Sequence, residues 1–238
     1  MLINLKKTIL PILLLLLNPP SILAKTNNPL DSTYVSVGGG YYRSNYQSDF
    51  TNYYLNTLVE KQSFNSINNN GYGQIGIGTS ANIGTLKFNH QLILSKLFNA
   101  VKFNTANSNW EFNQNFDFGY DWMPKFKLLH DLTAYGLLGV HYANFIYIKN
   151  SSLPSSTTFN SNEYQVGFDL GAGLYYKVTS YLEIGLKYQH ISYSAANTSG
   201  QSISTGSINN VYLPTTIHTQ NVTPSFNLIG AELRYYIF

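Results

Sequence analysis

The sequence has no cysteine and few charged residues. Without cysteine there is no disulfide framework, no thiolate metal site and no lipid-modified N-terminal Cys. Charged residues make up 11% of the 238 residues, against about a quarter in a soluble domain. Once Lys6 and Lys7 are set aside with the N-terminal segment, the 14 Lys and Arg fall to 12, against 11 Asp and Glu. No basic stripe remains to neutralise phosphates, so a nucleic-acid partner is not expected.

The N-terminus has the order of charge and hydropathy that is typical of a secretory signal peptide. Lys6 and Lys7 give the positive start, and Ile9 to Leu17 give a short apolar core. Prolines interrupt the apolar stretch, which is shorter than the ~20 residues that a spanning helix needs. The pattern predicts a signal peptide over residues 1–24 and a mature domain over residues 25–238. No other apolar stretch approaches spanning length, so a membrane domain here must be built from strands.

The strongest signal is a period-two alternation between apolar and polar residues. It is clearest between Trp110 and Trp122, where large aromatic residues occupy one face and polar, acidic or glycine residues the other. Aromatic residues at both ends of an apolar band are typical of a transmembrane strand, so we expect this face to contact lipid. The expected lipid-facing residues are Trp110, Phe112, Phe116, Phe118, Tyr120 and Trp122.

The same pattern recurs along the chain and predicts an all-β fold. The segments 164–178 and 182–188 alternate in the same way and are joined by a short turn, which predicts a hairpin. Eight strands match the smallest outer-membrane barrels, with both termini in the periplasm. The predicted fold is an antiparallel eight-stranded transmembrane β-barrel. Its strands are 34–42, 72–81, 86–95, 110–122, 133–148, 164–178, 182–188 and 225–238.

The connections between these segments alternate in length. Short periplasmic turns and long extracellular loops are the asymmetry expected of such barrels. The predicted turns are 82–85, 123–131 and 179–181. The predicted loops, rich in Asn, Ser and Thr, are 43–71, 96–109, 149–162 and 190–224. A soluble eight-stranded barrel with an apolar interior is the structural alternative, and the aromatic ends of the strands favour the transmembrane barrel.

The last segment ends at Phe238 with apolar or aromatic residues before it. In this respect the chain resembles the small outer-membrane barrels of the OmpA transmembrane-domain, opacity-protein and porin-family type. The resemblance implies that Tyr236 and Phe238 belong to the signal for barrel insertion. The phase departs from that pattern, because Arg234 stands where lipid should be contacted. A β-bulge near Tyr235 would reconcile the two phases.

The resemblance also implies location and partners. We expect the chain in the bacterial outer membrane, in contact with its lipid and lipopolysaccharide, after insertion by the barrel-assembly machinery. We expect a structural or surface-interaction role, in which the polar loops contact a host cell or another surface ligand, and no cofactor. A narrow pore is the alternative, because ionisable residues gather on the inward face. A filled lumen is favoured, since eight strands enclose little more than their own side chains. The expected lumen charge network is Glu111, Asp117, Asp121, Asp169, Glu183, Lys187, Glu232 and Arg234.

The histidines lack the helical spacing of a metal site, and no metal site is expected from local sequence. A site assembled from distant strands stays open. His190-Ile191-Ser192 resembles part of the lipid A 3-O-deacylase motif, which would make His190 the base and Ser192 the nucleophile. That family has Asn after the Ser, where Tyr193 stands here, and needs a downstream acid. The only one is Glu232, which is expected to face the lumen, so a hydrolase is the weaker alternative.

Overall fold

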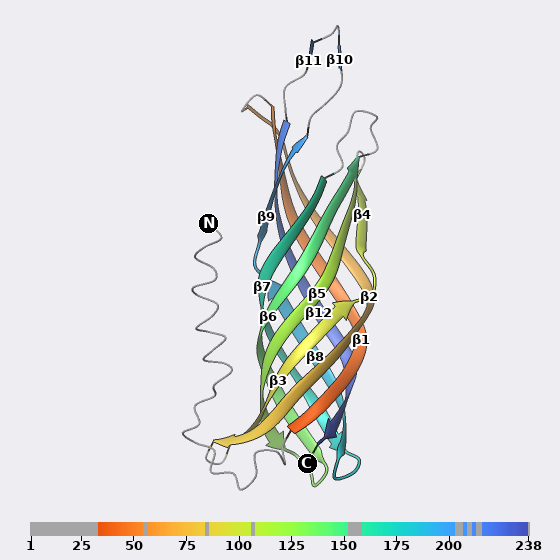
Figure 1. Cartoon of the computed structure of the whole chain (residues 1–238), viewed down its shortest axis with the longest axis vertical. Coiled ribbons are helices and arrows are strands. Elements are labelled where there is room, and N and C mark those ends of the chain that lie inside the picture. Colours follow the sequence, from red (N-terminus) through yellow and green to blue (C-terminus); the bar gives the residue numbers. More distant parts are fainter. Residues whose placement is uncertain are drawn as a thin grey trace.

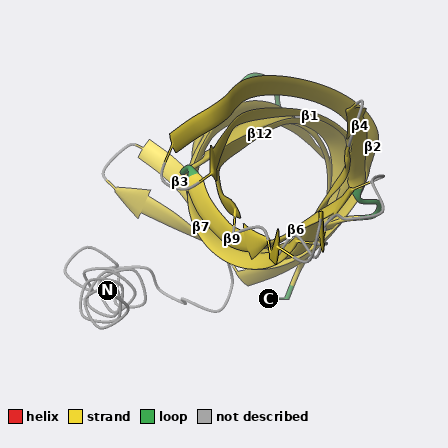
Figure 2. Ribbon diagram, turned by 90° about the horizontal axis from the view of Figure 1, so that it is seen from above, coloured by secondary structure: helices red, strands yellow, loops and turns green. Residues whose placement is uncertain are grey.

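The computed structural model describes residues 33–54, 57–83, 86–105, 108–151, 159–202, 207–208, 211–212 and 216–237. The predicted signal peptide, residues 1–24, and the terminal Phe238 lie outside them. The described chain forms an antiparallel barrel that closes where the first long strand pairs with the last. Figure 2 shows it from above as a ring of strands. Among the described residues no helix is long and apolar enough to cross a membrane.

Eight long strands, in the order β1-β2-β3-β5-β6-β7-β8-β12, form the wall (Figure 1). Two short strands continue the wall beyond a break, since β4 follows β3 along β5, and β9 follows β8 along β12. β10 and β11 form a separate small hairpin. The strands are β1 (Thr33–Tyr54), β2 (Thr57–Ile83), β3 (Leu86–Leu97), β4 (Val101–Thr105), β5 (Ser108–Lys127), β6 (Leu132–Ser151), β7 (Phe159–Lys177), β8 (Leu182–Tyr193), β9 (Ala196–Ser202), β10 (Ser207–Ile208), β11 (Val211–Tyr212) and β12 (Thr216–Tyr236).

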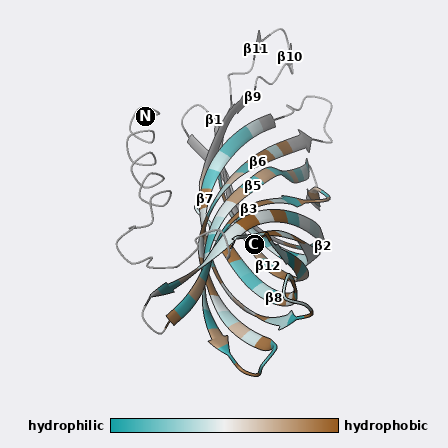
Figure 3. Cartoon of the chain, turned by 60° about the horizontal axis from the view of Figure 1, so that its bottom comes forward, coloured by the Kyte–Doolittle hydropathy of each residue, from teal (hydrophilic) through white to brown (hydrophobic). Residues whose placement is uncertain are grey.

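The outer face of the barrel carries an apolar belt near the end with the short turns. Residues that point outward there are exposed and aliphatic, such as Val37, Leu170 and Leu186. Aromatic residues border the belt on both sides, as the interfaces of a bilayer require. Figure 3 shows the apolar and polar residues alternating along these strands. The upper aromatic girdle is Tyr41, Phe98, Phe116, Tyr142, Tyr164 and Tyr188, and the lower girdle is Trp122, Phe126, Tyr176, Tyr181 and Tyr235.

All eight predicted strands are present, which confirms the fold class. All four of the predicted long loops were wrong in extent, including 149–162, where β6 continues to Ser151 and β7 begins at Phe159. Most of 43–71 is the hairpin of β1 and β2, whose pairing continues to Tyr54 and Thr57. The segment 96–109 contains β4, and 190–224 contains β9 and much of β12. Where their side chains are described, as at Arg43, Asn45 and Gln47 of β1, the outer face is polar, so the alternation of a membrane strand does not mark it.

The orientation of the first part of β5 was also predicted wrongly. A β-bulge at Asn115 shifts the pairing of β5 with β6 between Gln114 and Phe116. The bulge reverses the face on which alternate residues lie. The four aromatic residues Phe116, Phe118, Tyr120 and Trp122 lie on the outer face as predicted. Trp110 and Phe112 are instead buried inside the barrel. Glu111 points outward, so it is not a lumen residue.

The bulge predicted near Tyr235 was wrong as well. β12 pairs without a register shift with both β1 and β8. Leu233, Tyr235 and Ile237 are exposed on the outer face, while Arg234 is fully buried. Tyr236 follows the inward phase, and its ring lies 5.4 Å from that of Tyr34. The apolar outward phase of this strand therefore excludes Tyr236, which belongs to the lumen.

Candidate functional site in the barrel lumen

The lower lumen, at the end with the short turns, is filled around the buried guanidinium of Arg234. Its Nε donates to Glu232 Oε1 at 2.7 Å, and its Nη2 donates to Gln91 Oε1 at 2.8 Å. Its charge also lies over two rings, 3.8 Å from the centroid of Tyr175 and 4.6 Å from that of Tyr34. An arginine that is desolvated so completely needs both a charge partner and aromatic faces.

The network extends upward from Glu232 through hydrogen bonds of amide side chains. Gln74 Nε2 donates to Glu232 Oε2 at 2.9 Å, while Gln74 Oε1 accepts from Lys187 Nζ at 2.6 Å. Lys187 also donates to Gln189 Oε1 at 3.0 Å, and Gln189 Nε2 donates to Asp169. All five side chains are buried. The ammonium is therefore held by amides, and the carboxylate of Glu232 has the guanidinium as its charge partner.

Above Lys187 the network ends in an aspartate–histidine cluster, formed by Asp117 and Asp121 of β5, His141 of β6 and Asp169 of β7. The ring of His141 is surrounded by the three carboxylates. Its Nδ1 lies 2.9 Å from Asp117 Oδ2, and its Nε2 lies 3.2 Å from Asp169 Oδ2 and 3.5 Å from Asp121 Oδ1. All four side chains are buried. On β5, the residue paired with His141 is Gly119. A side chain there would collide with the imidazole, because its Cβ would stand 2.5 Å from His141 Cε1.

The upper lumen has a different content, an aromatic plug that consists of inward-facing rings above the belt. Phe226 lies at its centre, with ring centroids 5.8 Å from Tyr42, 6.1 Å from Phe145 and 5.8 Å from Tyr193. Edge-on and offset pairs of this kind add about 0.5–1.5 kcal/mol each beyond the area they bury. The plug comprises Tyr42, Tyr46, Trp110, Phe112, Phe145, Tyr147, Tyr193 and Phe226.

The structure brings together six of the eight residues predicted for the lumen network, namely Asp117, Asp121, Asp169, Lys187, Glu232 and Arg234. Glu183 lies at the turn end, half-buried, where its Oε2 accepts from the Tyr236 hydroxyl at 2.8 Å. Glu111 is on the outer face, 3.4 Å from Lys102 Nζ. Sequence reasoning left the histidine and the amides out of the lumen network. Their inward parity on the predicted strands was the signal that would have found His141, Gln74, Gln91 and Gln189.

His190 and Ser192 lie on the outer face of β8, beyond the girdle residue Tyr188. Ser192 is exposed and His190 half-buried. His190 Nδ1 is 2.9 Å from Oδ1 of Asn227, which also accepts from the Tyr188 hydroxyl at 2.8 Å. Glu232 faces the lumen and does not reach this pair. Hydrolysis by His190 and Ser192 remains a prediction from the sequence.

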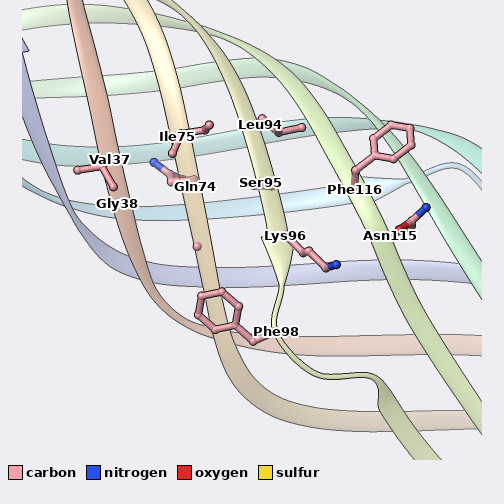
Figure 4. A pocket seen from close by; sticks show the side chains of 11 residues that line it. Val37, Gly38, Gln74, Ile75, Leu94, Ser95, Lys96, Phe98, Asn115 and Phe116 are labelled. Atoms are coloured by element: carbon pink, nitrogen blue, oxygen red, sulfur yellow. The ribbon is translucent and has the colours of Figure 1, made fainter.

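An open depression of about 430 Å³ lies on the lipid-facing wall between β1, β2, β3 and β5 (Figure 4). Its apolar lining includes Val37, Ile75 and Leu94, and the ring of Phe98 borders it. Gly73 makes room for that ring, because a Cβ there would stand 2.9 Å from Phe98 Cζ. Lys96 is the only charged side chain in the lining. The depression therefore has the character of the surrounding lipid surface rather than of a polar ligand site.

Comparison with solved structures agrees with this architecture. The outer membrane protease OmpT from Escherichia coli is similar over 90% of this chain and 99% of its own, with 11% identity and a TM-score of 0.51. The fold is that of an outer-membrane β-barrel. OprG from Pseudomonas aeruginosa (11% identity, 87% of this chain and 97% of its own, TM-score 0.44) and Ail from Yersinia pestis (12%, 86% and 99%, 0.35) are also similar. No family model matches the sequence, and no curated protein matches it.

Proposed function

We propose that this barrel is a bacterial outer-membrane protein whose working part is the wall that projects beyond the membrane. In this proposal the barrel has a structural and surface-interaction role and contacts a host cell or another surface. The observation that carries it is strand length. β1 has 22 residues and β2 has 27, whereas a tilted strand crosses the bilayer with about 9–11. The excess lies on the side of the long connections, which faces outward in barrels of this kind.

The outer face of β1 supports this division. Below the girdle its outward residues are Val35 and Val37, and above it they are Arg43, Asn45 and Gln47, all exposed. At about 3.3 Å per residue, ten further residues extend a tilted wall by roughly 20–30 Å. A passive anchor does not need a wall of this height. The described part of the outer face of β1 above the girdle is therefore polar, and it offers a contact area beyond the belt.

The filling of the lumen favours a closed barrel rather than a pore. The aromatic plug and the network around Arg234 lie one above the other inside the same wall, and an ion would have to displace both. We expect the refolded barrel, with insertion confirmed, to give no regular conductance steps in a planar bilayer. Reproducible steps would show a continuous water path and make transport the leading function instead.

The surface role is tested by shortening the strands that project beyond the membrane, while the apolar belt stays unchanged. Gln47 pairs with Asn65, and Asn197 pairs with Asn221. Replacing residues 48–64 and 198–220 by Asn-Gly turns therefore closes both hairpins in register. Escherichia coli cells that display the shortened barrel should lose most of their attachment to cultured host cells, compared with cells that display the full wall.

A matched control carries the same Asn-Gly turn in place of Thr179 and Ser180, at the opposite end of the barrel. It should attach like the parent. Surface amount and the heat-modifiable migration of folded barrels on gels are matched for all variants before attachment is compared. Equal attachment by the shortened and full-length barrels would contradict the proposal.

A further inference from the structure

The aspartate–histidine cluster contains more negative charge than its described neighbours balance. Asp117, Asp121 and Asp169 bring three carboxylates to one imidazole. The guanidinium of Arg234 is already paired with Glu232 at 2.7 Å. Among the described residues, Lys187 donates hydrogen bonds to Gln74 and Gln189 and to none of the three aspartates. Even with a protonated His141 and with Lys187 counted, one negative charge is left in a buried site, which is costly.

Three carboxylate oxygens in this cluster are buried and have no hydrogen-bond partner. They are both oxygens of Asp121 and Oδ1 of Asp169. Two of them, Asp169 Oδ1 and Asp121 Oδ1, lie beside the backbone of Gly139, where a Cβ would overlap the first and stand 2.6 Å from the second. Gly139 therefore leaves space beside the two oxygens. A buried acceptor without a donor is rare in native structures and calls for an explanation such as a bound ion.

The two sides of the imidazole differ in geometry. The Nδ1 side makes a hydrogen bond of ordinary charge-assisted length, 2.9 Å, with Asp117. The Nε2 side makes a longer hydrogen bond, of 3.2 Å, with Asp169 Oδ2 and lies 3.5 Å from Asp121 Oδ1. Two ligand atoms at about 2.0–2.2 Å from a tetrahedral zinc stand roughly 3.4 Å apart. The spacing around Nε2 thus matches the edges of a metal coordination shell.

We propose that His141 Nε2, Asp121 and Asp169 bind one divalent transition-metal ion, with Zn²⁺ as the best match. Asp117 would hold the Nδ1 proton and so present the Nε2 lone pair to the metal, as outer carboxylates do at many histidine-ligated zinc sites. The ion also balances the charge. With a neutral imidazole, the two positive charges of the metal and that of Lys187 offset the three carboxylates.

The ligand set favours zinc over the hard cations. Ca²⁺ takes six to eight oxygens and Mg²⁺ keeps several waters in an octahedral shell. An imidazole with two carboxylates suits Zn²⁺ and its transition-metal neighbours better. The site lies beneath the aromatic plug and joins β5, β6 and β7, so its effect is on stability. A metal bound only by the folded chain raises the stability of that chain.

The test uses the purified full-length chain refolded from urea into detergent, either with EDTA or with Zn²⁺ present from the start. After dialysis, elemental analysis should find one zinc per chain, and the zinc-loaded barrel should unfold at a higher temperature. Loading with Co²⁺ should give the visible absorption of four-coordinate cobalt. No retained metal, or equal unfolding temperatures with and without zinc, would overturn the proposal.

Variants separate a metal site from a structural cluster. Asp121→Asn should remove zinc retention and the zinc-dependent rise in unfolding temperature, while leaving the metal-free barrel as stable or more stable, because it removes a buried charge. Asp117→Asn should weaken zinc affinity about 10–100-fold. His190→Gln, a histidine change on the outer face, is the matched control and should bind zinc like the parent. A zinc response in Asp121→Asn equal to that of the parent would contradict the assignment.

Discussion

The two halves of the lumen are filled in opposite ways. Below the upper girdle, where lipid surrounds the wall, most of the interior is polar and built around Arg234 and His141, with one apolar cluster of Met123, Tyr135, Leu137 and Tyr175 near the short turns. Above it, where the outer face turns polar, the interior is the aromatic plug around Phe226. The lower half is therefore inverted relative to a soluble protein, and the upper half is not. The solvent outside the wall decides which arrangement applies.

The polar and the apolar filling contribute to the barrel in different ways. In lipid an apolar interior would leave both faces of the wall alike, so nothing would specify which face points outward. A polar lumen distinguishes the faces, at the cost that every buried charge needs a partner. In water the apolar plug is stabilised by burial in the ordinary way, and its rings need contact rather than matched charges. The upper lumen should therefore tolerate replacement of one apolar residue by another. The lower lumen should not tolerate a substitution that removes the partner of a buried charge.

The largest effect is expected from Arg234→Met in the lower half. It leaves Glu232 as a buried carboxylate without its charge partner, which should lower the free energy of unfolding by about 3–5 kcal/mol. Urea unfolding of the refolded barrel in lipid vesicles, followed by tryptophan fluorescence, measures the change. The double variant with Glu232→Gln removes both charges and should recover much of the loss. A single variant as stable as the parent would refute the role of this pair.

A smaller effect is expected in the aromatic plug. Phe226→Ala removes the ring that contacts Tyr42, Phe145 and Tyr193, and should cost about 3 kcal/mol through lost burial and a cavity. Phe226→Leu keeps the site apolar and should cost only about 1 kcal/mol. The same unfolding assay compares the two. Equal costs for both variants would mean that ring geometry, rather than apolar volume, holds the upper lumen.

The belt could be predicted from the sequence, because lipid outside and polar groups inside give a strict alternation. The segment 164–176 is an example in which the burial of the residues follows the predicted faces. The wall above the belt was predicted as loop. Its strands alternate in the opposite sense, with aromatic residues facing the lumen and polar residues facing outward. Adjacent apolar residues mark the reversal, at Tyr41-Tyr42 on β1 and at Leu228-Ile229 on β12. Of each pair, one faces lipid and the other faces the lumen.

The aspartate–histidine cluster was only partly predictable. Asp117, Asp121 and Asp169 followed from the inward parity of their strands. Their convergence on His141 depends on the register of β5, β6 and β7, in which Gly119 and Gly167 both lie opposite His141. A one-residue slip would move all of them to the other face. The local sequence does not fix that register.

The bulge at Asn115 is the point where sequence parity misled, and Glu111 gives its test. With the bulge, Glu111 lies on the outer face, 30% exposed, 3.4 Å from a more exposed Lys102. Pairs of this kind contribute little, so Glu111→Gln should change the free energy of unfolding by no more than about 0.5 kcal/mol. Glu232→Gln, the same change inside the lumen, should cost several times more because it strips Arg234 of its carboxylate. A large cost for Glu111→Gln would place that carboxylate in the lumen. In that case β5 would run without a bulge, and Trp110 and Phe112 would face outward instead of filling the plug.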